Sequence, residues 1–369
     1  MNPQYIYELK SWPIFSWDRG LIALKLEQVH FNQGRLVEKM ERLGFKTQEE
    51  AVLQTLTEDI LKTNEIEGEV LDRKQVRSSV ARKLGMDFVG LVQSERNVDG
   101  VVEMMLDATQ KYKSPLTEER LFAWNASLFP TGHSGMTKIL VGKWRDDSSG
   151  PMQVISRPIG KTRIHFQGPE AKKIRKEMRQ FLTWVNGKRT EDSLICTAIA
   201  HLWFITIHPF EDGNGRIARA IADMFLTKSE MGRQRFYSMS AQINTERKDY
   251  YKILESTQKG SLDITSWLDW FLSCLNRAIG NSESMLSTVL KKATFWETHQ
   301  QVRFNDRQKK IINRLLDSFA GKLTSSKWAV MGKCSQDTAS RDIAELIENN
   351  ILKKNPGGGR NTSYSLMID

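Results

Sequence analysis

The sequence predicts a mainly α-helical protein, with a helical core, a small β-hairpin flap and a C-terminal winged helix-turn-helix domain. Three observations support this fold class. Apolar residues recur at helical spacing through most of the chain. Residues 131–169 alone are rich in Gly, Ser and Pro, with short alternating segments typical of a hairpin. Residues 306–369 combine three helical patterns with a glycine-tipped hairpin at 351–366.

Composition places the chain among soluble globular proteins, with 40% hydrophobic and 27% charged residues in 369. The longest apolar run, residues 194–207, is shorter than a membrane span, so we expect no membrane partner. Three widely spaced cysteines and the lack of a signal peptide favour a cytoplasmic location. A net charge of +10 would help the protein to bind phosphate or an acidic partner.

We expect four segments along the chain. They are an N-terminal helical domain at 1–90, a helical core at 91–280, a connecting helix at 281–305 and the winged helix domain at 306–369. In the first, residues 47–67 have helical periodicity, and Gly68 is a typical helix stop. Further helices are expected at 72–84, 99–112, 116–128, 170–186, 191–207, 215–228, 246–258 and 263–278.

The twelve residues from His208 to Arg219, HPFEDGNGRIAR, follow the apolar run and precede an amphipathic segment. Gly213, Asn214 and Gly215 adopt positive φ at low cost, so successive backbone N–H groups can converge on one anion. The helix that begins near Gly215 adds its unpaired N–H groups and its dipole to the same place. The stretch therefore predicts an anion-binding turn.

The charged residues of this stretch specify the anion further. Arg216 and Arg219 lie three apart, on one face of the first helical turn, which suits a polyphosphate. Asp212 is a carboxylate beside that site, where Mg²⁺ is usually held. His208 ends the apolar helix and can accept a proton near neutral pH. Each residue alone would indicate an ordinary turn, loop or solvent-exposed face. Their combination at this spacing is not explained in that way.

The stretch matches the motif HxFx[D/E]GNGRxxR at every defined position, and the chain thereby resembles the Fic family. The resemblance implies a helical core that binds ATP and Mg²⁺ and transfers AMP to a Ser, Thr or Tyr hydroxyl of a target protein, the chain itself included. It implies that His208 is the base and that Asp212 holds Mg²⁺. The phosphate-binding residues would be Gly213, Asn214, Gly215 and Arg216, with Arg219 on the γ-phosphate.

The segment from Thr63 to Gly68, TNEIEG, resembles the family's inhibitory motif [S/T]xxxE[G/N]. Without the longer motif, Glu67 would be read as a surface residue before a C-cap glycine. With it, the resemblance implies that Glu67 pairs with Arg219 and occupies the γ-phosphate position. We therefore expect an autoinhibited enzyme.

The hairpin residues Arg163, Ile164, His165 and Phe166 resemble in place the family's flap, which aligns the target segment by strand addition. An ordinary surface hairpin is the alternative. Tyr251 lies where the family commonly places an adenine contact. The N-terminal aromatic segment is similar to an uncharacterised domain of many bacterial Fic proteins.

The C-terminal unit is basic, with twelve Lys and Arg against seven Asp and Glu in residues 301–369. Residues 335–343 are expected to form a recognition helix, and 351–366 the wing. This favours DNA and a docked protein equally as partner, since winged helices serve both functions. The oligomeric state, including a homodimer, stays open.

Two other functions compete with adenylyl transfer. The first is a Fic-type phosphotransferase, or a transferase using another nucleotide donor, but the intact Gly215-Arg216 end of the motif argues against phosphate transfer. The second is a DNA-binding regulator whose Fic core only senses a nucleotide. The presence of both His208 and Asp212 argues against that alternative.

Overall fold

The computed structural model describes residues 5–86, 90–148, 150–156, 163–231, 234–316, 319, 321–356 and 362–367. The chain divides into two compact units, Met1–Gly44 with Gln48–Ser282, and Phe45–Thr47 with Glu283–Asp369. The first unit thus contains most of the expected N-terminal domain together with the expected core. Residue 90 marks no break in its packing.

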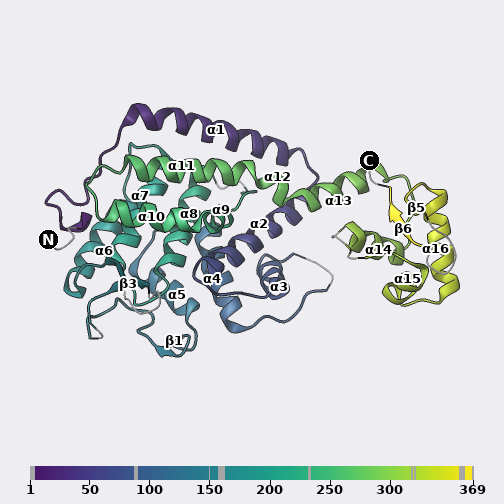
Figure 1. The fold of residues 1–369 in the computed structure, drawn as a ribbon, viewed down its shortest axis with the longest axis horizontal. Helices are drawn as coiled ribbons and strands as arrows, with labels where there is room; N and C mark the ends of the chain where they lie inside the picture. The colour runs from purple at the N-terminus through teal and green to yellow at the C-terminus, as the bar shows by residue number, and fades with distance from the viewer. Residues whose placement is uncertain are drawn as a thin grey trace. The chain divides into compact units, whose positions relative to one another are not determined.

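The elements before residue 282 are mostly helices, with two short hairpins between α5 and α6 (Figure 1). In chain order they are η1 (Ile6–Glu8), α1 (Arg19–Glu41), α2 (Phe45–Ile66), α3 (Arg73–Lys83), α4 (Arg96–Gln110), α5 (Glu118–Leu128), β1 (His133–Ser134), β2 (Thr137–Lys138), β3 (Gln153–Ser156), β4 (Arg163–Gln167), α6 (Ala171–Asn186), α7 (Ser193–Ile207), α8 (Asn214–Ser229), α9 (Met239–Thr245), α10 (Arg247–Gln258) and α11 (Thr265–Gly280).

Helix α7 is the centre of the first unit, because every residue from Leu194 to Ile207 is buried. A helix that is apolar on all sides must be surrounded by other elements. Helices α6, α8 and α11 pack against α7, and α1 lies along α11 (Figure 1). Within the described part of the chain, no helix has the length and apolar content needed to cross a membrane. The loop between α7 and α8 therefore emerges from the core of a helical bundle.

Helix α2 is joined to α8 by a buried ion-pair network. Arg235 donates to Asp59 of α2 at 2.6 Å and to Asp223 of α8 at 2.5 Å. The Ser238 hydroxyl donates a further hydrogen bond to Asp59. Burial raises the pKa of Asp223 to about 7, while the charge of Arg235 acts in the opposite direction. The network fixes the helix that carries Glu67 against the helix that carries the motif arginines.

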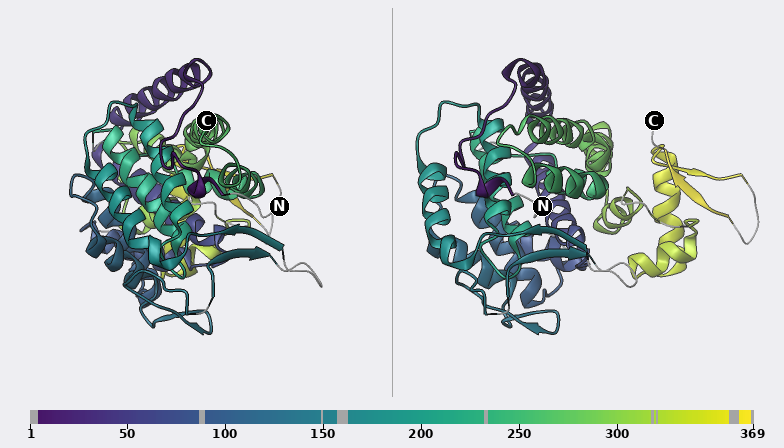
Figure 2. Two further views of the ribbon diagram at one scale, coloured as in Figure 1. Left: turned by 90° about the vertical axis from the view of Figure 1, so that its left-hand side faces the viewer. Right: turned by 60° about the vertical axis from the view of Figure 1, so that its left-hand side comes forward.

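The expected flap is present as the antiparallel pair β3 and β4, with Gln153 opposite Gln167 and a bulge between Val154 and Ile155. The hairpin projects from the helices of its unit (Figure 2). Its tip, residues 157–162, lies outside the described residues. The expected hairpin region also contains the two-residue strands β1 and β2.

Among the described residues, the second unit consists of several helices followed by one hairpin. Its elements are α12 (Ser282–Met285, which spans the boundary), α13 (Ser287–Thr298), α14 (Asp306–Leu316), α15 (Ser325–Gly332), α16 (Gln336–Glu348), β5 (Leu352–Lys354) and β6 (Tyr364–Leu366). Lys333, in a left-handed conformation, ends α15, and Tyr364 also bridges to Leu323.

The assignment of this unit as a winged helix-turn-helix domain stays a prediction. The DNA or protein partner expected for it, and a homodimer of the chain, also stay predictions. Of the expected wing, residues 357–361 lie outside the described residues.

The expected connecting helix at 281–305 was wrong in its extent. Two helices occupy this region, and the second ends at Thr298. Phe295 is buried in the hydrophobic core of the second unit, with Trp296 and Phe304 packed against it. The aromatic residues thus make this segment a part of the second unit's core.

Replacing Arg235 by Met should lower the free energy of unfolding of the first unit by about 3–5 kcal/mol, because two buried carboxylates lose their partner. The measurement is urea denaturation, followed by the fluorescence of tryptophans, most of which lie in this unit. The control is Arg42→Met, since Arg42 and Glu38 form an exposed ion pair worth about 0–1 kcal/mol. Equal unfolding midpoints for the two variants would show that the network does not hold α2.

Candidate active site

The loop between α7 and α8 has the backbone geometry of an anion-binding turn. His208 caps α7 with φ 52°, a left-handed conformation, and Gly213 precedes α8 with φ 84°. The first hydrogen bond of α8 runs from Ile217 N–H to Gly213 O, at 3.0 Å. The amides of Asn214, Gly215 and Arg216 precede it, so they lack partners within the helix. They provide donors and the positive end of the helix dipole for an anion.

His208 has the tautomer required of a general base. Its Nδ1 lies 3.1 Å from Ile205 O, and because a carbonyl only accepts, Nδ1 carries the proton. The other ring nitrogen, Nε2, is then unprotonated in the neutral ring. Burial lowers the pKa of His208 to about 4, so the neutral form prevails at pH 7. The imidazole can therefore accept a proton without first losing one.

Two side chains hold the loop in shape. Asn214 accepts from Phe210 N–H at 3.0 Å and donates to Phe210 O at 2.8 Å. Phe210 is fully buried. Arg145 is also buried and donates from Nε to His208 O at 2.8 Å, and from its guanidinium to Pro169 O. Asn214 thus contributes its backbone amide to the anion site, while its side chain serves the loop.

Both motif arginines are buried and are occupied by the end of α2. Arg219 donates from Nε to Thr63 Oγ1 and from Nη2 to Glu67 Oε1, each at 2.7 Å. Its side chain is 2% exposed. Arg219 Nη1 and Arg216 Nε have no hydrogen-bond partner among the described residues. The contact expected between Glu67 and Arg219 is present, and buried donor capacity remains for a further anion.

A second carboxylate, not anticipated from the sequence, lies on the first motif arginine. Glu69 Oε2 accepts from Arg216 Nη1 at 2.7 Å, and Asn64 Oδ1 accepts from the same nitrogen at 3.2 Å. Arg216 also lies over the ring of Phe129, 5.0 Å from its centroid. The Glu69 carboxylate therefore neutralises the arginine that Glu67 leaves unpaired.

The end of α2 explains how two carboxylates two residues apart reach two arginines. Gly68 has φ 86°, and Glu69 N–H bonds back to Asn64 O at 3.0 Å. This is the pattern of a Schellman cap, in which the left-handed glycine reverses the chain direction. The signal in the sequence was an acidic residue directly after the expected C-cap glycine.

Asp212 lies beside the anion turn and suits a magnesium ion. The Ser134 hydroxyl donates to its carboxylate, and Asn125 donates to its backbone carbonyl at 3.1 Å. Among the described residues, no three His, Cys, Asp or Glu side chains gather to hold a metal. A single carboxylate next to phosphate-binding amides fits Mg²⁺, which takes its other ligands from phosphate and water.

A pocket of about 600 Å³ brings these groups together. It is lined by Glu67, His208, Asp212, Arg219 and Tyr251, among others. This volume is in the range of a small-molecule site. Tyr251 donates to Ile66 O at 3.3 Å, at the end of α2. The pocket thus joins the expected base, metal ligand, inhibitory glutamate and adenine contact.

The flap forms one wall of the same pocket. Phe166 is buried, and its ring lies 6.4 Å from that of His208 and 5.2 Å from that of Tyr5. His165 lines the pocket and contacts Glu255 of α10. Ile164 is 44% exposed and Arg163 points to the same glutamate. Among the flap residues expected from the family resemblance, His165 and Phe166 therefore line the pocket, and Arg163 contacts Glu255, which also lines it.

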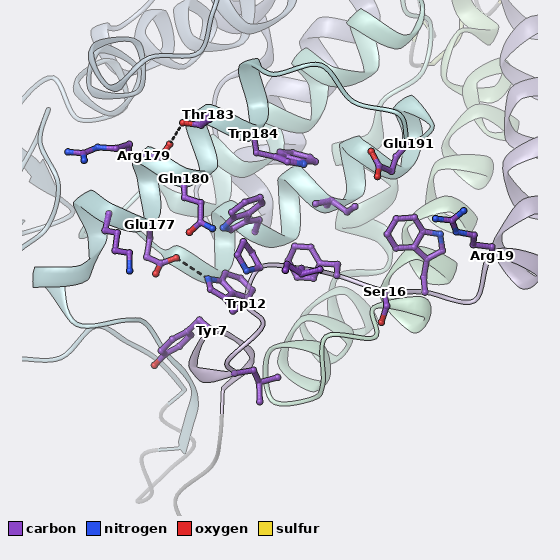
Figure 3. Close-up of a pocket in the computed structure, with 18 residues that line it drawn as sticks. Tyr7, Trp12, Ser16, Arg19, Glu177, Arg179, Gln180, Thr183, Trp184 and Glu191 are labelled. Atoms are coloured by element: carbon purple, nitrogen blue, oxygen red, sulfur yellow. Dashed lines mark hydrogen bonds between the residues drawn. The ribbon is translucent and has the colours of Figure 1, made fainter.

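A larger groove, of about 1180 Å³, lies between the N-terminal segment and α6 (Figure 3). It is lined by aromatic residues such as Trp12 and Trp184, and Trp12 Nε1 donates to Glu177 at 2.9 Å. None of the residues from His208 to Arg219 lines it. The smaller pocket is therefore the candidate active site.

Comparison with known families agrees with this location. Residues 115–226 match the Fic/DOC family, and residues 5–86 match a domain of unknown function, DUF4172. The Fic match contains the loop and both motif arginines. The other match contains α2 and, directly after it, Glu67 and Glu69.

Curated relatives match over short segments. The chain is 30% identical over 113 residues to "Protein adenylyltransferase Fic" of Nematostella vectensis, covering 30% of the chain and 25% of that protein. It is 26% identical over 91 residues to a probable protein adenylyltransferase of Aquifex aeolicus (strain VF5), covering 25% and 26%. The match thus spans about a quarter of the length of these relatives.

Solved structures support the fold over a longer range. A Fic family protein from Desulfovibrio desulfuricans G20 aligns with a TM-score of 0.58 at 19% identity, over 97% of this chain and 99% of that one. A Fic domain containing signaling protein from Bacteroides thetaiotaomicron VPI-5482 aligns with a TM-score of 0.51 at 20% identity, over 71% and 98%. The chain thus contains a Fic/DOC domain at residues 115–226, preceded by a DUF4172 domain at residues 5–86.

Proposed function

We propose that the protein is an adenylyltransferase that moves AMP from ATP to a Ser, Thr or Tyr hydroxyl of a target protein, itself included. The observation that carries the proposal is a neutral histidine with a free Nε2, in one pocket with an anion turn and the motif arginine Arg219. Relatives that match over short segments of the chain are named as adenylyltransferases, which agrees with the proposal. A cytoplasmic location fits such a reaction.

Each group has a defined task in the reaction. His208 Nε2 accepts the proton of the target hydroxyl as its oxygen attacks the α-phosphorus of ATP. The bond from that phosphorus to the β-phosphate bridging oxygen breaks, and pyrophosphate leaves. The amides before Ile217, with Arg216 and Arg219, bind the phosphates and stabilise the charge that develops. Asp212 would hold Mg²⁺, which neutralises phosphate charge when bound.

We further propose that the described state is autoinhibited. Glu67 on Arg219 and Glu69 on Arg216 place two negative charges where the β- and γ-phosphates would bind. A polyphosphate must displace both carboxylates or bind in another position. The Cβ of any larger residue at Gly215 would meet Glu67 Oε1 at 2.3 Å, so the glycine allows this close approach.

ATP labelled at the α- or the γ-phosphate distinguishes AMP transfer from phosphate transfer. We expect protein-bound label from α-³²P-ATP alone, and a loss of about a hundredfold or more in His208→Ala because the base is gone. Protein-bound label from γ-³²P-ATP would instead support the phosphotransferase. If the protein binds the nucleotide but takes up label from neither form of ATP, the result would support a regulator whose Fic core only senses a nucleotide.

Removing the two carboxylates should raise AMP transfer in steps. We expect Glu67→Gly and Glu69→Gln each to raise the rate of self-labelling by about tenfold, and the double variant to exceed both. Glu65→Gln is the matched control, because Glu65 sits in the same turn but pairs with Lys62 and Asn244. A Glu69→Gln rate equal to that of the control would remove Glu69 from the inhibition.

The pH dependence should report the low pKa of His208. In Glu67→Gly, kcat/KM for ATP should stay level from pH 7 to about 5 and fall as the pH approaches 4, since only the neutral ring is a base. Loss of the Glu67 charge, which raises the pKa of His208, shifts the fall further down. A fall centred near 6.5, the usual histidine value, would contradict the buried base.

A further inference from the structure

Glu255 of α10 accepts hydrogen bonds from three basic side chains, two of which belong to the flap. Its Oε2 lies 2.7 Å from His165 Nδ1, and its Oε1 lies 3.2 Å from Arg163 Nη2. Lys259, one turn further along α10, donates to Oε1 at 2.8 Å. These partners lower the pKa of Glu255 to about 2 despite its partial burial, so it is a carboxylate at neutral pH. The flap is thus tied to the helix by a charged contact.

Strand β4 is held by two different parts of the chain. The register passes from Val154 opposite Phe166 to Ile155 opposite Ile164, so His165 is the extra residue of the bulge and its direction follows from its contacts. Arg163 and His165 reach Glu255, whereas Phe166 packs against Tyr5 and His208. Within the described residues, β4 pairs with β3 alone. A two-stranded ribbon is marginally stable by itself, so its position depends on such contacts.

We propose that Glu255 is a positioning residue that latches the flap to α10 and thereby fixes the strand edge on which the target segment is laid. This rests on the proposed transferase function. Glu255 and His165 also line the pocket that contains His208. The latch therefore sets the wall of the pocket and the target platform together, and it acts on target binding without touching the reacting atoms.

Loss of the contact between Glu255 and the flap should weaken target binding without changing the chemical step. With the latch open, β4 keeps its pairing with β3 and its contact through Phe166, but the hairpin samples more orientations. A target must then select the aligned orientation, which weakens its apparent binding by the fraction of time spent aligned. Once the target is aligned, the base and the phosphate-binding residues are unchanged, so turnover at saturation is preserved.

Hydrogen exchange of the intact chain tests the latch directly. In Glu255→Ala, amide protection in residues 163–167 should fall by about tenfold, and in Glu255→Gln by less, because the amide oxygen still accepts a bond without the charge. Asp249→Asn is the matched control, since it removes one negative charge from the exposed face of the same helix. Protection in Glu255→Ala equal to that in the control overturns the proposal.

Transfer between two molecules tests the consequence. The enzyme is Glu67→Gly with or without Glu255→Ala, and the acceptor is the full chain carrying His208→Ala, titrated with α-³²P-ATP present. We expect KM for the acceptor to rise about tenfold, kcat to stay within about twofold and the ATP dissociation constant to change by less than threefold. A fall in kcat at unchanged KM would overturn the positioning role. If no label transfers in any variant, the transferase proposal fails, while the exchange experiment still decides the latch.

A double-mutant cycle with His165→Asn identifies the partner. Because Glu255 and His165 contact each other, the loss of protection in the double variant should be smaller than the product of the two single losses. If the losses of protection in the two single variants multiply in the double variant, the two residues act independently, which would contradict the proposed latch.

Discussion

Two buried arginines on the first turn of α8 require negative charge, and this requirement organises the first unit. The side chains of Arg216 and Arg219 are 3% and 2% exposed. A guanidinium so deeply buried is stable only when it is paired and hydrogen-bonded. The end of α2 supplies the pairing through Glu67 and Glu69, and ATP phosphates would supply it in the active state. In the proposed function, inhibition and catalysis are two solutions to one electrostatic problem, because α2 and the nucleotide would compete for the same donors.

The surrounding structure confines this competition to one turn of helix. Arg235 anchors α2 to α8 through Asp59, two turns before Glu67, so the body of α2 stays in place. Only the segment after Thr63, with the left-handed Gly68, is free of that anchor. On the other side, Arg145 and Asn214 hold His208 and the loop in a strained left-handed geometry that isolated histidine rarely adopts. These contacts hold the loop that contains His208 in place. The end of α2, with Glu67, can leave the site by a local change.

The sequence predicted the loop, because its short motif has a direct chemical meaning, and the resemblance to the Fic family implied the contact between Glu67 and Arg219 and the place of the flap. It could not predict Arg145, the Arg235 network or Glu255, since each acts on a partner distant in the chain and leaves no local periodicity. Glu69 was missed although its place directly after the expected C-cap glycine was a signal. Helix α9 was missed for a related reason: it is seven residues long, begins at a Ser238 cap and is defined by packing. The extent of the connecting helix was wrong because its end depends on tertiary packing: Phe295 is buried in the second unit's core and Phe304 packs against that core.

The central claim is that Glu67 and Glu69 occupy the binding places of the terminal phosphates of ATP. The most direct measurement is the dissociation constants of ATP and AMP, by calorimetry with Mg²⁺, for the wild type and for Glu67→Gln/Glu69→Gln. The account predicts that ATP binds about tenfold or more tightly to the double variant while AMP, which lacks those phosphates, changes by less than twofold. An equal change for both nucleotides, or none for ATP, would contradict it.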